Sequence, residues 1–190
     1  MTISIKRDAV IGLALARGGS RGLPRKNVRL LGGHPLIAWA VGVGVASPSV
    51  DRVLCSTDDS EIASAAWRYG AEVPFHRPEE HASDTATDLD VFTHLLDWLA
   101  ENEGELPEFI VQLRPTTPFR DPAWIDRAIE RMRADRSITC MRSVAPAPHT
   151  PYKMWRDAGD GRLEPLLTLP GVAEPFNMPR QALPVVWWHT

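Results

Sequence analysis

Cysteine is nearly absent from this chain, which has only Cys55 and Cys140 among its 190 residues. The two lie far apart without metal-ligand spacing, and the six histidines are equally scattered. A zinc site is therefore not expected. Both cysteines fall in apolar, strand-like runs, so we expect them to be reduced and buried in the core of a cytoplasmic protein.

An excess of positive charge is also missing. The net charge is -3, which argues against a general binder of nucleic acid or membrane surfaces. No segment is long enough to span a membrane. Lys6, Arg7 and the apolar run after them faintly resemble a signal peptide, but Asp8 interrupts them and a basic loop follows where cleavage would occur. We therefore expect a soluble protein that is not secreted.

What the sequence does have is an alternation of strand-like and helix-like segments. With 190 residues, 44% of them hydrophobic, the chain suits one domain with a full core. Apolar runs predict strands at 10–16, 50–57, 108–113 and 137–144, and periodicity predicts helices at 35–46, 58–70, 85–102 and 122–132. This order is typical of a three-layer α/β fold with a mostly parallel sheet. Ligands of such sheets lie beyond the carboxyl ends of the strands, where we expect loops 17–29, 56–58 and 114–121 to converge.

The first of these loops is unusually basic. The stretch ARGGSRGLPRKN at 16–27, extended to Arg29, holds five basic residues, three glycines and no acid. Glycines let backbone N–H groups approach one anion, and Arg17, Arg21 and Lys26 would add charge-assisted contacts to a polyphosphate. The pattern matches neither G-x-x-x-x-G-K-[ST] nor G-x-G-x-x-G. On spacing alone, a phosphate site and a solvated basic loop both stay open.

The last 46 residues differ from the rest. They hold eight of the 17 prolines and show no sustained period, yet they are too apolar for a disordered tail. The chain also stops at an apolar run, VVWWHT. We therefore expect an irregular arm that packs on something, in a sequence that is a piece of a longer protein.

The basic loop closely resembles the signature loop of the acylneuraminate cytidylyltransferases. The likeness continues through STDDSEIA, GAEVPFHRPEEHASDTA, QLRPTTPFR and PRQALP, and covers essentially all 190 residues in order. The related 3-deoxy-manno-octulosonate enzymes carry a different loop and an acidic turn where this chain has 112–115, which favours nine-carbon sugar acids. The resemblance implies a Rossmann-like nucleotidyltransferase domain at 1–190, with a proline-rich dimerisation and substrate arm at 145–184.

The resemblance also implies a reaction, the transfer of CMP from CTP to the anomeric hydroxyl of a sialic, legionaminic or pseudaminic type of sugar acid, with release of pyrophosphate. The implied partners are CTP, the sugar acid and a second copy in a homodimer. The implied cofactor is Mg²⁺, whose aspartate ligands would lie beyond Thr190. A non-catalytic nucleotide-binding relic and a nucleotidyltransferase for another acidic sugar, such as 3-deoxy-manno-octulosonate, are the alternatives.

Residue roles are implied by positions that match the family's motifs. The implied nucleotide-binding residues are Arg17, Gly18, Gly19, Ser20, Arg21, Lys26, Asn27, Arg77, Ser83 and Asp84. The sugar acid would be bound by Gln112 and Arg180, and the implied catalytic residues are Arg17, Lys26 and Arg180. Arg21 stands where lysine is more usual, which keeps the charge but alters its geometry.

Blander interpretations stay open for several of these residues. Arg77 could form a surface ion pair with Glu79 or Glu80. Gln112 could simply close a strand, and Arg180 could be solvated. Asp58 is expected to cap a helix and organise its loop rather than to bind metal.

Overall fold

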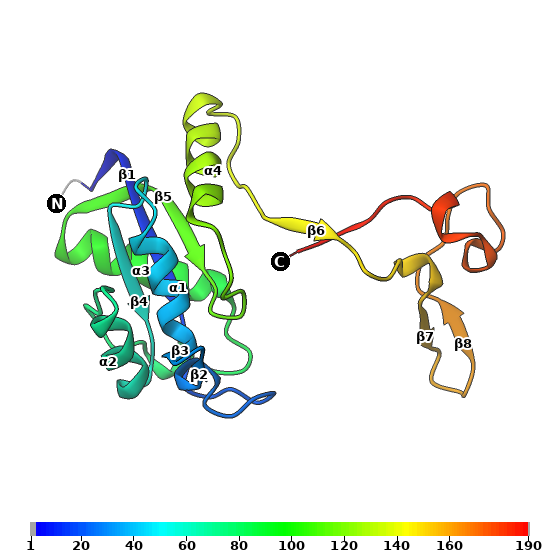
Figure 1. The fold of residues 1–190 in the computed structure, drawn as a ribbon, viewed down its shortest axis with the longest axis horizontal. Helices are drawn as coiled ribbons and strands as arrows, with labels where there is room; N and C mark the ends of the chain where they lie inside the picture. The colour runs from blue at the N-terminus through cyan, green and yellow to red at the C-terminus, as the bar shows by residue number, and fades with distance from the viewer. Residues whose placement is uncertain (1–2, 190) are drawn as a thin grey trace. The chain divides into compact units, whose positions relative to one another are not determined.

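The computed structural model describes residues 3–189, which divide into two compact units with the boundary between Thr139 and Cys140. The first unit contains a three-stranded sheet in the order β4-β1-β5 (Figure 1). Its strands are β1 (Ser4–Leu15), β4 (Arg52–Ser56) and β5 (Glu105–Leu113), and both pairings are parallel. The predicted parallel sheet is confirmed.

Helices cover both faces of this sheet, which gives the predicted three layers (Figure 1). They are α1 (Leu36–Val45), α2 (Ser60–Arg68), α3 (Asp88–Asn102) and α4 (Pro122–Ala134). α1, α2 and α4 share one core with Val10 and Ala14 of β1, while α3 packs on Ile11 and Leu13 from the other side. Successive residues of a strand point to opposite faces of the sheet, so β1 is buried on both faces. Its sequence is therefore a continuous apolar run.

Caps fix where the helices begin. Thr87 and Asp90 form a capping box at the start of α3, and Asp121 caps α4 as predicted, with Pro122 in its first turn. The predicted cap of α2 was wrong by one residue. Asp59, not Asp58, accepts hydrogen bonds from the backbone N–H groups of Glu61 and Ile62, each at 3.0 Å.

Two glycines allow α1 to lie unusually close to the sheet. A Cβ atom at Gly44 of α1 would meet Cδ1 of Leu113 at 2.6 Å, and one at Gly12 of β1 would meet the same atom at 2.9 Å. Leu113 is fully buried at the end of β5, so it has little room to turn away. The absence of side chains at 12 and 44 therefore sets the distance between α1 and the end of β5.

Short elements complete the first unit. They are η1 (Lys26–Val28), the hairpin of β2 (Leu30–Leu31) and β3 (His34–Pro35), and η2 (Glu79–His81). β1 begins earlier than predicted, because the chain continues through an irregularity between Lys6 and Val10 where Asp8 has a φ of 62°. Among residues 3–189, every helix is too short or too polar to cross a bilayer.

The strand predicted at 137–144 is wrong. Only Val144 of that stretch lies in a strand, because no described strand offers hydrogen-bonding partners to 137–143. The expectation for Cys140 is wrong for the same reason, since its segment has no sheet to bury it and its side chain is exposed. Cys55 in β4 is buried as predicted.

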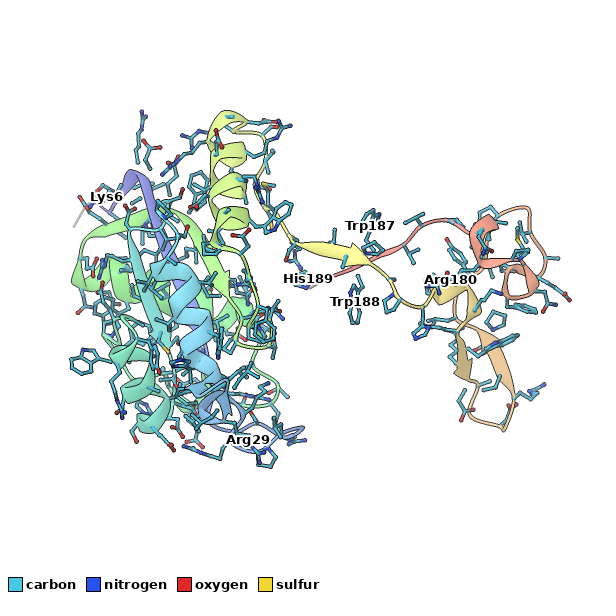
Figure 2. The ribbon with its side chains drawn as sticks, viewed as in Figure 1. Lys6, Arg29, Arg180, Trp187, Trp188 and His189 are labelled. Atoms are coloured by element: carbon cyan, nitrogen blue, oxygen red, sulfur yellow. The ribbon has the colours of Figure 1, made fainter. Side chains whose placement is uncertain are left out.

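The second unit consists of two small antiparallel ribbons and short turns of helix. β6 (Val144–Pro146) pairs with β9 (Trp187–His189), and β7 (Trp155–Asp157) pairs with β8 (Leu163–Pro165). Between them lie η3 (Pro151–Lys153), η4 (Pro175–Asn177) and η5 (Arg180–Ala182). Trp187 and Trp188 remain mostly exposed on β9 (Figure 2). That this unit reaches a second subunit stays a prediction.

Candidate functional site

The basic loop leaves the carboxyl end of β1 and is fixed there by polar contacts. The backbone N–H of Ala16 donates to the carbonyl of Ser56, 3.2 Å away. The side chain of Asn27, which is buried, donates to the carbonyl of Arg17 at 3.0 Å, and so ties the return of the loop to its start. The N–H of Gly18 donates to Oδ1 of Asp58 at 2.9 Å, so Asp58 organises the loop as predicted. The loop is therefore held to the rest of the fold by these hydrogen bonds.

The glycines of the loop serve different purposes. A Cβ atom at Gly18 would lie 2.9 Å from a carboxylate oxygen of Asp59, so the close approach of α2 requires glycine there. Gly19 and Gly22 face open space, with nothing within 4 Å of a Cβ. At these two positions the backbone is accessible to a ligand, as an anion-binding loop demands.

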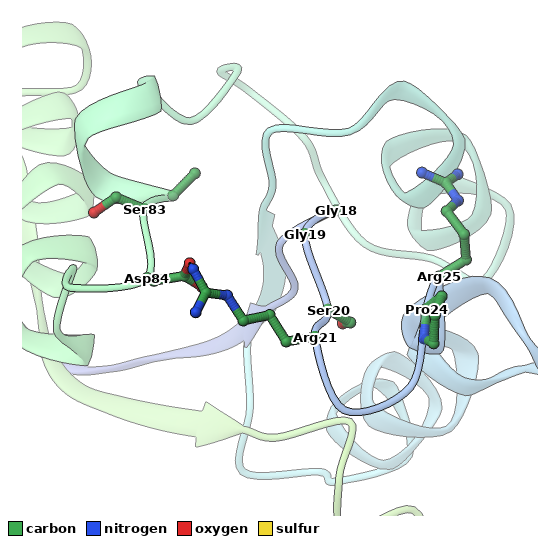
Figure 3. A pocket seen from close by; sticks show the side chains of 9 residues that line it. Gly18, Gly19, Ser20, Arg21, Pro24, Arg25, Ser83 and Asp84 are labelled. Carbon is green, nitrogen blue, oxygen red and sulfur yellow. The ribbon is translucent and has the colours of Figure 1, made fainter.

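The loop and residues 82–84 together line an open cavity of about 420 Å³ (Figure 3). Its lining residues are Gly18, Gly19, Ser20, Arg21, Pro24, Arg25, Ala82, Ser83 and Asp84. Six of the residues predicted to bind nucleotide are among them: Gly18, Gly19, Ser20, Arg21, Ser83 and Asp84. A seventh, Arg17, lies beside the cavity and contacts the segment 83–84. Its guanidinium donates to the carbonyl of Ser83 at 2.5 Å.

An aspartate holds the two outer arginines of the loop. Oδ1 of Asp84 accepts from Arg17 at 3.0 Å, and Oδ2 is paired with Arg21, which reaches across the cavity in Figure 3. The Arg21 side chain is 82% exposed, so the contact is screened and readily exchanged. The carboxylate of Asp84 is therefore the anion that Arg17 and Arg21 both bind in the free protein.

The remaining cations of the loop behave differently from one another. Arg25 turns away from the cavity and pairs with Asp59 and Glu61 of α2 (Figure 3). Burial alone would raise the pKa of Asp59, but hydrogen bonds from Arg25 and from the helix amides outweigh burial and lower it. Lys26 opens η1, is half-buried and has no ion-pair partner among residues 3–189. No carboxylate of the described residues neutralises its ammonium, unlike the guanidinium groups of Arg17, Arg21 and Arg25.

Arg77 lies inside the fold, so its interpretation as a surface ion pair is wrong. Only 4% of it is exposed, and its Nε donates to Oγ of Ser56 at 3.0 Å. A second N–H group bonds the Ser56 carbonyl, and the Arg77 backbone N–H donates to Thr57 at 2.8 Å. Burial lowers the pKa of its guanidinium, while the Asp58 carboxylate opposes this effect. Arg77 thereby fixes the turn after β4 beside the basic loop, and direct contact with a nucleotide stays a prediction.

The third predicted loop starts at the end of β5. Register pairs Leu15 with Ser56 and Ala14 with Leu113, so the carboxyl ends of all three strands meet at one edge, as predicted. Here Gln112 donates from Nε2 to Oδ2 of Asp88 at 2.8 Å, and Arg114 pairs with the same oxygen. Gln112 thus has a polar partner on α3, and its contact with a sugar acid stays a prediction.

Arg180 lies in the second unit, on η5 (Figure 2). Its guanidinium donates to the carbonyls of Ala147, at 3.3 Å, and of Pro148. These contacts tie η5 to the chain that follows β6, so Arg180 is not simply solvated. Its catalytic and substrate-binding roles stay predictions.

The residues described do not fit a magnesium site built by the protein. Within 3–189 no group of three or more His, Cys, Asp or Glu side chains could hold a metal ion. The carboxylates nearest the cavity, Asp58, Asp59 and Asp84, are already hydrogen-bonded or ion-paired. Magnesium demands a near-octahedral set of oxygen ligands, which these engaged side chains do not provide.

Sequence reasoning missed three residues that organise this edge. Asp59 joins the loop to α2, Asp88 joins α3 to β5, and Arg114 shares Asp88 with Gln112. The signal for Asp59 was present, since DDSE offers two candidate caps. Nothing in the sequence indicated that Asp88, 24 residues before Gln112, would contact it.

Comparisons with known proteins agree with this geometry. The sequence model of a family described as cytidylyltransferase matches residues 11–149. The chain is 39% identical over 123 residues to a CMP-N,N'-diacetyllegionaminic acid synthase of Legionella pneumophila, covering 64% of this chain and 52% of that protein. It is 31% identical over 172 residues to an N-acylneuraminate cytidylyltransferase of Oncorhynchus mykiss, covering 90% of this chain and 37% of that protein. The chain therefore belongs to the cytidylyltransferase family, and the predicted resemblance to its acylneuraminate members is confirmed.

A solved structure supports the fold. It is that of a CMP-2-keto-3-deoxy-manno-octonic acid synthetase complexed with CTP, with a TM-score of 0.62 at 18% identity, covering 96% of this chain and 71% of that one. At this identity the likeness concerns the fold alone, and it confirms the predicted Rossmann-like nucleotidyltransferase architecture. The chain spans 52% and 37% of the two curated relatives.

Proposed function

We propose that this chain binds CTP through the basic loop and belongs to an enzyme that transfers CMP to a nine-carbon 2-keto sugar acid. The observation that carries the proposal is the cavity lined by Gly18, Gly19 and Arg21 of the glycine loop and by residues 82–84, at whose Asp84 the guanidinium groups of Arg17 and Arg21 meet. The names of the two curated relatives, which refer to legionaminic and acylneuraminic acids, support this acceptor class over 3-deoxy-manno-octulosonate.

The chemistry explains why such a loop is needed. The anomeric hydroxyl of the acceptor attacks the α-phosphorus of CTP, a new P–O bond forms, and the bond to pyrophosphate breaks as the hydroxyl loses its proton. CTP brings about four negative charges, and catalysis of such transfers consists mainly of positioning and charge stabilisation. Arg17, Arg21 and Lys26 would supply that stabilisation, with the N–H groups near Gly19 and Gly22 as uncharged donors.

Binding would require an exchange of partners. Arg17 and Arg21 are held by Asp84, so the phosphates of CTP would replace that carboxylate. Asp84 and Ser83 would then be free to contact the ribose, as the family resemblance implies. Mg²⁺ with ligands outside the described residues, a homodimer built through 145–184, and a cytoplasmic location remain proposals that rest on the resemblance.

The test is selective stabilisation by CTP. Melting temperature is measured with CTP, UTP, ATP, GTP or inorganic tripolyphosphate, each with magnesium chloride. Ligand at 100 times its dissociation constant contributes about 2.7 kcal/mol, which corresponds to a rise of roughly 5–11 °C for a chain of this size. We expect the largest rise with CTP. Equal rises for all four nucleotides and tripolyphosphate would leave a generic phosphate site and refute the cytidine assignment.

A further inference from the structure

Arg25 has an unusual backbone conformation where the glycine loop turns back. Its φ is 57° and its ψ 28°, in the left-handed region, and within residues 3–189 Asp8 is the one other non-glycine residue with a positive φ. A residue with a long side chain rarely adopts this conformation, which costs free energy and persists only where the surroundings hold it. Because such residues cluster at ligand sites and switches, the contacts that hold Arg25 indicate what its conformation serves.

Two carboxylates of α2 hold Arg25 in place. Asp59 and Glu61 both pair with its guanidinium, which points toward α2 in Figure 3. Asp59 is itself fixed as the cap of α2 by two backbone N–H groups. The same carboxylate lies 2.9 Å from the place that a Cβ atom would take at Gly18. One side chain of α2 therefore lies against the start of the loop, at Gly18, and also holds its return, at Arg25.

Lys26 lies between two fixed points of this return. Before it, Arg25 is held by α2, and after it the buried Asn27 donates from Nδ2 to the carbonyl of Arg17 at 3.0 Å. The N–H of Lys26 itself donates to the carbonyl of Leu23 at 3.1 Å, and η1 packs against α1 and α2. Since φ and ψ are the two soft torsions of each residue, the conformation of Arg25 sets the direction in which the chain enters Lys26.

We propose that Arg25 is a positioning residue for phosphate binding: held in the left-handed conformation by Asp59 and Glu61, it fixes the place from which Lys26 contacts the phosphates. The inference rests on the proposed function and deepens it, because it makes α2 part of the phosphate site without giving α2 a ligand group.

The distribution of carboxylates argues against direct contact between Arg25 and the phosphates. Arg25 has two carboxylates of α2 to itself, whereas Arg17 and Arg21 share the single carboxylate of Asp84. An incoming phosphate chain therefore displaces one carboxylate to free two arginines at Asp84, but would have to displace two carboxylates to free Arg25 alone. Arg25 accordingly keeps its partners when the ligand binds.

The test measures the affinity of the whole chain for inorganic tripolyphosphate by calorimetry, with magnesium chloride present. Arg25→Asn removes the ion pairs while asparagine tolerates the left-handed conformation, so the change adds little strain of its own. We expect a loss of roughly 3- to 10-fold, and a loss of less than about twofold when the same change is made in Lys26→Ala. Arg25→Lys should recover part of the loss, because its ammonium can still pair with a carboxylate of α2.

Asp59→Asn separates positioning from diffuse attraction. Asparagine caps a helix about as well as aspartate, so α2 is kept while its ion pair with Arg25 is lost. The change removes a negative charge beside the loop, so diffuse attraction alone would tighten tripolyphosphate binding, whereas loss of positioning should weaken it by about 2- to 5-fold. Arg136→Asn is the matched control, since Arg136 pairs with Glu108 near the start of β5 and should leave the affinity within about twofold of the unaltered chain.

Equal losses from Arg25→Asn in the unaltered chain and in Lys26→Ala would mean that Arg25 acts on the phosphates independently of Lys26, and would overturn the proposal. Tighter binding by Asp59→Asn would overturn it too, as would a chain that does not bind tripolyphosphate. A fall of more than about 4 °C in the melting temperature of free Arg25→Asn would make Arg25 a structural residue instead. Equal binding of all four nucleotides would refute the cytidine assignment alone, because tripolyphosphate tests the loop without a base.

Discussion

Replacing Lys26 with alanine should weaken CTP binding strongly and leave the free protein almost as stable as before. The structure gives the reason for both halves of this expectation. Lys26 is half-buried at the start of η1, and its ammonium has no counter-ion among residues 3–189, so the folded protein loses no ion pair. Its neighbour Arg25, by contrast, is already engaged with α2 and would be a poor choice for this test.

The magnitude follows from the kind of contact that is lost. A hydrogen bond to a charged group in a partly desolvated site is worth about 1.5–3 kcal/mol. That range corresponds to a loss of roughly 10- to 150-fold in CTP affinity. Calorimetric titration with CTP measures the affinity, and thermal unfolding without ligand measures the stability.

The control must remove one positive charge elsewhere in the same unit. Lys6→Ala does so, because Lys6 lies on β1 at the end of the unit opposite Arg29 and the basic loop (Figure 2). Equal losses for Lys6→Ala and Lys26→Ala that disappear at high salt would indicate diffuse attraction and refute a specific contact. A large fall in the melting temperature of free Lys26→Ala would refute it too, since Lys26 would then be structural.

Three further outcomes follow from the described contacts. Asp84→Asn should release the two loop arginines and tighten inorganic pyrophosphate by roughly 1.5- to 5-fold in a titration, and unchanged affinity would mean that the carboxylate does not compete. A hydrogen bond from Arg52 lowers the pKa of Glu103, so its stabilisation is present above pH about 4.3 and is lost as pH falls through the folded pKa. Glu103→Gln should therefore melt about 1–4 °C lower at pH 7 and match the unaltered chain once the pH is below the folded pKa of Glu103, and a difference that does not shrink as the pH falls would contradict this. Burial raises the pKa of Cys55 to about 12 while Cys140 is exposed, so a disulfide reagent should modify one thiol in the folded chain and two in denaturant.

Elements whose burial comes from local pattern could be predicted from the sequence. The apolar run of β1, the stripe on α3 and the cap at Asp121 each carry their own signal, and all three are where they were expected. The segment 137–143 failed because strand formation requires a partner, which no local pattern specifies. The exposure of Cys140 follows from that failure.

In the candidate site, too, some residues could be predicted from local sequence while others depend on contacts made by the fold. The basic loop and residues 83–84 were found because their residue types stand in recognisable order along the chain, and they do line one cavity. Arg77 is different, since whether an arginine is buried depends on which carbonyls the fold brings to it, here that of Ser56, 21 residues away. The pairing of Asp88 with Gln112 likewise depends on the packing of α3 against β5.

Gly12 and Gly44 both lie close to Leu113, so substitutions at these three positions depend on one another during evolution. A methyl group at 44 would fall 2.6 Å from Cδ1 of Leu113, so alanine there requires a smaller residue at 113 or a displaced helix. A Cβ at 44 would also meet Cγ2 of Val53 at 2.8 Å. Homologous chains without glycine at 44 should therefore show smaller side chains at 53 and 113 or a displaced α1. Since 113 lies between Gln112 and Arg114, drift in the spacing of α1 would also move the two side chains held by Asp88. Divergence in substrate choice among relatives could thus begin in the core, at a glycine that no ligand touches.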